Sequence, residues 1–228
     1  MNEVVAIVEG ETELTFVRDQ LAGHLILRQV NIWPVLPGRQ RRHGGVKEWD
    51  VAKQDIVRTL REGRYCTTMF DFYAMPASWP GRSEAAKLPW QQRAAHVEAG
   101  MLRDVAAAMS RGFDPARFIP YAQLHEFEAL AFADVSELAS VTAPLTQTPL
   151  ESLRHAFQSI VNEAGDPEAI DDGFETCPSR RILGQVKPYR KRLHGPIVTQ
   201  RIGLDALRKR CRHFASWVDR LERIESRG

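Results

Sequence analysis

Acidic side chains stand at the ends of three apolar runs of the sequence, at the places where predicted strands stop. These acids are Glu9 and Glu13 after the first run, Asp71 after the second, and Glu126 and Glu128 after the third. Carboxylates that share one place repel one another, and a hard divalent cation such as Mg²⁺ or Mn²⁺ removes that repulsion. The pattern therefore predicts a metal site with these acids as ligands, suited to activating water for phosphodiester cleavage.

Each of these acids also has a simpler interpretation. Glu13 lies in the first turn of a predicted helix, where a carboxylate complements the helix dipole. Asp71 is placed to cap a turn, and Glu126 and Glu128 suit a solvent-exposed position equally well. Only the meeting of all three strand ends at one sheet edge favours the metal site over these alternatives.

The apolar runs alternate with segments of helical periodicity, as in a parallel sheet with helical crossovers. Strands are predicted at Val4–Val8, Val30–Leu36, Tyr65–Phe70 and Phe118–Leu124. Helices are predicted at Thr12–Leu21, 47–62, Pro89–Arg111 and His125–Phe132, with a long loop at Ala74–Leu88. Ligands of such sheets bind at the carboxyl ends of the strands, which is where the acids stand.

This order predicts an α/β fold, Rossmann-like, with a four-stranded parallel sheet flanked by helices over residues 1–134. Pro34 favours an edge position for the second strand. Beyond residue 134 the strand signals stop, so residues 135–228 are expected to form a helical extension packed on the core. Its helices are predicted at Glu151–Asn162, Leu204–Arg210 and His213–Arg223, with an irregular stretch at Pro178–Pro196.

The small net charge of +2 hides two oppositely charged stretches. Acidic residues outnumber basic ones by eleven to one over 123–178, and the ratio is reversed over 179–213. One interpretation is an acidic zone for metal and a basic zone for nucleic-acid phosphate, and the other is two solvated faces that attract each other. Candidate phosphate-binding residues in the basic stretch are Ser179, Arg180, Arg181, Lys187, Lys191 and His194.

Several classes of protein are disfavoured by what the sequence contains. The three cysteines stand far apart without a Cys-x-x-Cys pair, which argues against a zinc knuckle or redox motif and suits a reducing cytoplasm. The run Val4–Val8 is too short for a signal peptide or membrane span, so a cytoplasmic protein without membrane contact is expected. Serine-hydrolase and zinc-protease motifs are missing, and the basic loop Arg39–Gly45 lacks the Walker pattern. Trp79, on the long loop, is a candidate for stacking on a base.

The chain resembles DUF4276, an uncharacterised bacterial family whose core is similar to the Toprim domain of topoisomerases, primases and OLD-type nucleases. The resemblance extends over nearly the whole chain and rests on the segments Val8–Glu13, Thr68–Tyr73, Gln123–Leu130, Glu175–Ile182 and Leu193–Pro196.

That resemblance implies roles for the strand-end residues. It implies that Glu9 binds metal and acts as general acid or base, and that Glu13 is a second acid one helical turn later. Toprim domains carry Asp-x-Asp after the third strand, whereas this chain has Asp71-Phe72-Tyr73. Asp71 is retained as a catalytic and metal-binding residue, but Tyr73 is a poor Mg²⁺ ligand and would instead bond phosphate or donate a proton. Glu126 or Glu128 is expected to supply the missing carboxylate.

The resemblance further implies a Mg²⁺- or Mn²⁺-dependent nuclease acting on DNA or RNA in bacterial defence against phage. A separately encoded ATPase of the AAA or ABC type is the expected partner. The alternative is a non-catalytic subunit with a degenerate Toprim site that binds nucleic acid or protein, an interpretation that Tyr73 favours. Metal-dependent cleavage by the purified protein separates the two hypotheses.

Overall fold

The computed structural model describes residues 1–38, 48–109, 111–170, 173 and 175–224, so the basic loop Arg39–Gly45 lies outside the described residues. The chain divides into two compact units, and each is described by itself. The first unit comprises Met1–Gln123 together with Trp217–Gly228, and the second comprises Leu124–Ser216. This division differs from the boundary expected at residue 134, because the end of the chain returns to the first unit.

A parallel sheet forms the centre of the first unit and confirms the predicted α/β fold. Its strands run in the order β2-β1-β3-β4, and β5 pairs with β3 beyond β4. Their bounds are β1 Asn2–Val8, β2 Val30–Val35, β3 Tyr65–Asp71, β4 Phe118–Ile119 and β5 Ala122–Gln123. Every residue from Val4 to Val8 is buried, as expected of a strand covered on both faces. The strand with Pro34 is the edge strand, as predicted.

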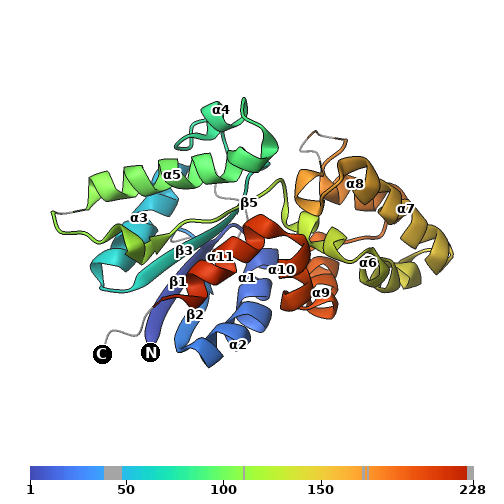
Figure 1. Ribbon diagram of the computed structural model, residues 1–228, viewed down its shortest axis with the longest axis horizontal. Coiled ribbons are helices and arrows are strands. Elements are labelled where there is room, and N and C mark those ends of the chain that lie inside the picture. The colour runs from blue at the N-terminus through green and yellow to red at the C-terminus, as the bar shows by residue number, and fades with distance from the viewer. Residues whose placement is uncertain (39–47, 110, 171–172, 174, 225–228) are drawn as a thin grey trace. The chain divides into compact units, whose positions relative to one another are not determined.

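Helices cover both faces of this sheet (Figure 1). One face carries α3 Trp49–Arg61 and α5 Trp90–Ala108, and the short α4 Arg82–Ala85 precedes α5. The chain between β1 and β2 forms α1 Glu11–Phe16, η1 Val17–Leu21, α2 Ala22–Leu25 and η2 Ile26–Arg28, and η3 Pro115–Arg117 precedes β4. The last helix, α11 Arg212–Glu222, returns to the sheet. There Trp217 donates a hydrogen bond to Thr67 Oγ1 (2.8 Å) and stacks on Tyr121, with ring centroids 4.3 Å apart.

The predicted strand Phe118–Leu124 is instead two short strands with a break between them. Pro120, which has no N–H to donate, stands in that break. The N–H of Tyr121 donates to the side-chain oxygen of Thr68 in β3 (2.9 Å) rather than to a backbone carbonyl of that strand. The two strands nevertheless pair with successive parts of β3, so the carboxyl edge stays where the sequence predicts it.

The expectation that Trp79 is available to stack on a base is wrong. Its side chain is buried, and its ring packs on Trp49 and Phe70 with centroids 5.2 and 5.1 Å away. The loop that carries Trp79 therefore folds onto the core rather than standing out from it, and part of it forms α4.

The second unit is helical. Its elements are η4 Phe127–Ala133, α6 Val135–Thr142, η5 Ala143–Leu145, α7 Leu150–Ala164, η6 Pro167–Ala169, α8 Pro178–Gln185, α9 Lys191–Ile202 and α10 Leu204–Arg210, followed by the start of α11. Phe132 and Phe157 form an edge-to-face pair in its core, with centroids 5.9 Å apart. The stretch Pro178–Pro196, expected to be irregular, is mostly helical. Pro178 occupies the first turn of α8, where its missing N–H costs nothing, and Pro196 lies inside α9.

The three cysteines are free and buried, and Cys66 lies in β3 of the sheet. Of the helices in the described ranges, none combines the length and the apolar character that crossing a bilayer requires.

Candidate functional site

Glu9 and Asp71 lie side by side at the carboxyl edge of the sheet in the first unit. β1 and β3 are adjacent parallel strands with Val8 opposite Met69, so the residues that follow them leave the sheet together. The backbone N–H of Asp71 donates a hydrogen bond to Glu9 Oε2 (2.8 Å), and the N–H of Glu9 bonds to the Met69 carbonyl (3.1 Å). We call Glu9 and Asp71 the strand-end pair.

Glu13 and Tyr73 flank the strand-end pair along the chain. Glu13 is buried in α1, and its Oε2 lies 3.3 Å from the position that a Cβ on Gly10 would occupy. Glycine at position 10 therefore leaves room for this carboxylate beside the turn that follows Glu9. Tyr73 is half-buried in the turn after β3.

Arg82 is a cation at the end of β3 that the sequence patterns did not single out. Its guanidinium carbon lies 3.9 Å from the centroid of the Phe72 ring, and its Nε donates to the Phe72 carbonyl (3.1 Å). The sequence pattern could not reveal Arg82, because a long irregular segment separates it from the end of β3. Its guanidinium places a positive charge on Phe72, the residue directly after Asp71.

The strand-end pair fits one kind of metal site and not another. Among the described residues there is no group of three or more His, Cys, Asp or Glu side chains that could hold a metal ion. A site built wholly from protein ligands therefore does not match the residues present. Mg²⁺, however, is commonly held by one or two carboxylates, with water and substrate phosphate completing its shell. Glu9 and Asp71 fit that substrate-completed type.

Glu126 and Glu128 form a second pair of carboxylates, in the second unit, and we call them the buried pair. Their side chains are 6% and 2% exposed. The ammonium group of Lys191, from the first turn of α9, lies 2.7 Å from Glu126 Oε1 and 3.5 Å from Glu128 Oε2. The backbone N–H of Ser179, in the first turn of α8, donates to Glu126 Oε2 (2.9 Å). The buried pair thus has a cation supplied by the protein itself.

The surroundings of the buried pair shift the pKa values of its two acids in opposite directions. Burial alone would raise the pKa of Glu126, but Lys191 and Ser179 together hold that pKa below its usual value. Burial raises the pKa of Glu128 to about 7, although Lys191 opposes the shift. Two acids of one pair with pKa values driven apart are a common arrangement of acid–base sites.

Tyr189 lies near the buried pair. Burial, together with the negative charges of Glu128 and Glu126, raises the pKa of its phenol well above the ordinary value. Its hydroxyl and Glu128 Oε1 are buried, and neither has a hydrogen-bond partner in the described part of the chain. Periodicity could not mark Tyr189, because it stands between two helices.

The backbone before the buried pair is unusual. His125 is buried and has a φ of 62°, in the left-handed region that few non-glycine residues adopt. Strained backbone of this kind persists where the surrounding structure fixes it, and here it directly precedes Glu126.

Several predicted phosphate-binding residues already have partners inside the second unit. Arg181 forms an ion pair with Glu163 (3.2 Å), and Lys191 neutralises the buried pair. His194 accepts a hydrogen bond from the N–H of Arg190 at Nδ1 (2.8 Å), and burial followed by the charge of Arg190 lowers its pKa. Ser179 is likewise buried against Glu126, whereas Arg180 and Lys187 are exposed. Phosphate binding by these six residues stays a prediction.

Comparison with known proteins identifies a family. The family model described as "Domain of unknown function (DUF4276)" matches residues 8–222. No curated protein is significantly similar to the chain in sequence. Among solved structures, the C-terminal region of the Xanthomonas campestris pv. campestris OLD protein is similar, with 14% identity, coverage of 96% of this chain and 93% of that chain, and a TM-score of 0.47.

Proposed function

The chain belongs to the DUF4276 family, and we propose that it is a Toprim-type phosphodiesterase that hydrolyses nucleic acid with the help of Mg²⁺ or Mn²⁺. One observation carries the proposal: Glu9 and Asp71 meet at the carboxyl ends of adjacent parallel strands, joined by a 2.8 Å hydrogen bond. That edge is where open parallel sheets bind ligands. Two carboxylates there suit a hard cation that a phosphate completes.

The residues of the first unit have distinct tasks in this proposal. The N–H of Asp71 orients the Glu9 carboxylate, and the side chains of both residues would serve as ligands. When bound, the metal would polarise the phosphodiester and lower the pKa of a water molecule. Arg82, fixed against Phe72, supplies a positive charge for a phosphate oxygen. Tyr73 is placed to donate a hydrogen bond or a proton.

The buried pair is not part of the metal centre that we propose. Glu126 and Glu128 were predicted as further metal ligands, and their oxygens instead meet the ammonium group of Lys191. The metal centre that we propose therefore rests on Glu9 and Asp71, with Glu13 as the additional acid of the first unit.

The biological setting belongs to the same proposal. The core of the family resembles the Toprim domain, and Toprim nucleases of the OLD type often act beside an ATPase in defence against phage. We therefore propose a separately encoded ATPase as the partner, and copurification after joint expression tests it.

A cleavage assay tests the proposed activity. Purified protein is incubated with plasmid, single-stranded DNA and RNA, in Mg²⁺, in Mn²⁺ and in EDTA, with and without the coexpressed ATPase. We expect cleavage that requires metal and that falls at least ~100-fold in Glu9→Gln and in Asp71→Asn. Glu11→Gln is the matched control, because Glu11 is exposed in the same first turn of α1 and should leave cleavage unchanged.

The alternative function is a non-catalytic subunit, and Tyr73 in place of a second carboxylate is the observation that favours it. No cleavage of any substrate under any condition would support that alternative. Tyr73→Phe refines the assignment. If the phenol donates a proton or bonds phosphate, this variant loses activity, and if Tyr73 only packs in the turn, activity is retained.

A further inference from the structure

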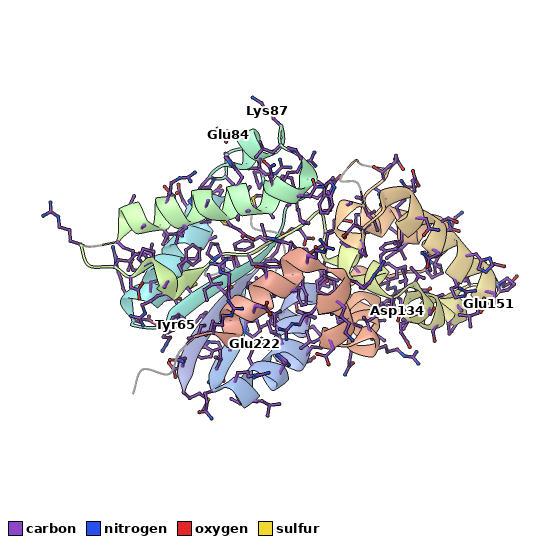
Figure 2. The ribbon with its side chains drawn as sticks, viewed as in Figure 1. Tyr65, Glu84, Lys87, Asp134, Glu151 and Glu222 are labelled. Atoms are coloured by element: carbon purple, nitrogen blue, oxygen red, sulfur yellow. The ribbon has the colours of Figure 1, made fainter. Side chains whose placement is uncertain are left out.

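A cavity lies at the amino end of β3, whereas the strand-end pair lies at the carboxyl end of that strand. It has a volume of about 480 Å³, which falls within the range typical of small-molecule sites. All of its lining residues belong to the first unit: Tyr65, Asp114, Ala116, Ile119, Arg220, Arg223 and Ile224. Tyr65 begins β3, as labelled in Figure 2, and Asp71 ends it. Six steps along a strand span roughly 20 Å, so the two places are separate sites.

Positive charge dominates this cavity. Arg220 lies on α11 and Arg223 follows its last residue, and both side chains are exposed. Within the ranges that the structure describes, neither arginine forms an ion pair, and the only hydrogen bond of the Arg220 side chain is a long one (3.5 Å) to the Pro120 carbonyl. Arg117 does not line the cavity, but its guanidinium lies 5.3 Å from the centroid of the Tyr65 ring, which does. Two arginines one helical turn apart are well suited to bind the oxygens of a phosphate.

The other lining residues indicate a ligand that is larger than an inorganic anion. Ile119 and Ile224, which are 5% and 7% exposed, give the cavity an apolar side, and Tyr65 adds an aromatic ring. Asp114 caps η3 by accepting the N–H of Ala116 (3.0 Å), and it is also one of the residues that line the cavity. A carboxylate at this place repels a phosphate but accepts hydrogen bonds from a hydroxyl or an amino group. A ligand with a phosphate at one end and a ring bearing such groups at the other matches all of these walls.

We infer that this cavity is a nucleotide site, which takes a phosphate monoester carried on a nucleoside. The phosphate lies against Arg220 and Arg223, and the nucleoside lies against the isoleucines, Tyr65 and Asp114. Two sources offer the same chemistry, namely a free nucleoside monophosphate and the 5′-phosphorylated end of a nucleic-acid strand. The inference concerns a second site and does not depend on the proposed hydrolysis at the strand-end pair.

Calorimetric titration of the full chain in EDTA tests the inference, because chelation prevents any contribution from metal-dependent binding. The ligands are inorganic phosphate, AMP, and a tetranucleotide with either a 5′-phosphate or a 5′-hydroxyl. AMP or the 5′-phosphorylated tetranucleotide should bind at least ~10-fold more tightly than inorganic phosphate. Tighter binding of AMP identifies the free nucleotide as the source, and tighter binding of the 5′-phosphorylated strand identifies the strand end.

The variants assign the binding to this cavity. Arg220→Gln with Arg223→Gln should weaken binding at least ~10-fold. Arg28→Gln is the matched control and should bind as the unchanged protein does, since Arg28 is exposed on η2 of the same unit. A thermal unfolding curve for each variant shows that it is folded. The inference is overturned if no phosphate compound binds at millimolar concentration, if inorganic phosphate binds as tightly as AMP and the strand end, or if the double variant binds equally well.

Discussion

The molecule holds two pairs of carboxylates that look alike in the sequence and differ in the structure. The strand-end pair, Glu9 and Asp71, lies half-buried at a sheet edge and is linked through one backbone N–H. The buried pair, Glu126 and Glu128, is enclosed among helices and shares the ammonium group of Lys191. Acids that follow an apolar run can therefore lie at a sheet edge, where we propose that they bind metal, or be neutralised by a lysine of their own unit.

The pH dependence of stability should separate the two pairs most clearly. Burial raises the pKa of Glu128 to about 7, compared with 4.5 for the ordinary group. Between these values the folded protein holds a proton that the unfolded chain has lost, so the free energy of unfolding falls as pH rises through this window. A shift of this size corresponds to about 3 kcal/mol over the whole titration, and most of that change falls between pH ~5 and ~8. Over the same range Glu126, with its lowered pKa, is ionised in both states.

Urea unfolding of the unchanged protein and of Glu128→Gln at both pH values measures this effect. The variant should lose most of the pH dependence, because glutamine does not titrate. If the free energy of unfolding changed equally with pH in the two proteins, Glu128 would be ionised in the folded state, contrary to this account.

Removing the internal cation should be the next largest effect. Lys191→Met leaves the buried pair without its counter-ion, and a buried charge that loses its partner is strongly destabilising. Because Lys191 is 43% exposed and water replaces part of its contact, we expect a loss of about 2 kcal/mol at neutral pH. Lys191→Arg should recover most of it. Lys187→Met, at an exposed lysine, is the control and should change the free energy of unfolding by less than ~0.5 kcal/mol.

Another buried acid of the second unit, Glu168, is held by hydrogen bonds from backbone N–H groups. Glu168 accepts the N–H groups of His213 and Phe214 (2.9 and 3.0 Å) at the start of α11. Glu168→Gln presents an amide N–H to one of these donors, so we expect a loss of about 1 kcal/mol in urea unfolding. A gain in stability would show that burial of this charge outweighs its capping bonds.

The smallest effect on stability should come from the strand-end pair itself. Glu9→Gln keeps an oxygen for the N–H of Asp71 and removes one of two neighbouring negative charges. The free energy of unfolding should therefore change by less than ~0.5 kcal/mol without added metal. A loss above 2 kcal/mol in the same unfolding experiment would make Glu9 a structural residue and would break the comparison.

The sequence predicted the sheet well, because buried parallel strands have an unmistakable pattern. Val4–Val8 is a continuous apolar run, and Tyr65–Phe70 combines aromatic, apolar and β-branched residues. The ends of these segments predict that Glu9 and Asp71 share one sheet edge, and the pairing of β1 with β3 brings the two residues together. The break at Pro120 was missed because an apolar run around a proline looks continuous. Hydrophobicity likewise could not show that Trp79 turns inward, since that depends on Trp49 and Phe70 from other elements.

The contact of the buried pair with Lys191 could not be predicted from the sequence for a different reason. A carboxylate and a lysine 65 residues apart carry no local sign that they will meet. The basic stretch predicted contacts to phosphate, whereas Lys191 contacts acids of its own unit. The helix of Lys191 was also missed, because Pro196 made the segment look irregular.

Metal binding at the strand-end pair tests the central claim most directly. Mn²⁺ is titrated calorimetrically into the full chain, into the double variant Glu9→Gln with Asp71→Asn, and into the control Glu11→Gln, each with a phosphorothioate oligonucleotide that resists cleavage. The account predicts one binding event in the unchanged protein and in the control, weakened at least ~100-fold in the double variant. Equal Mn²⁺ binding by all three proteins would contradict it.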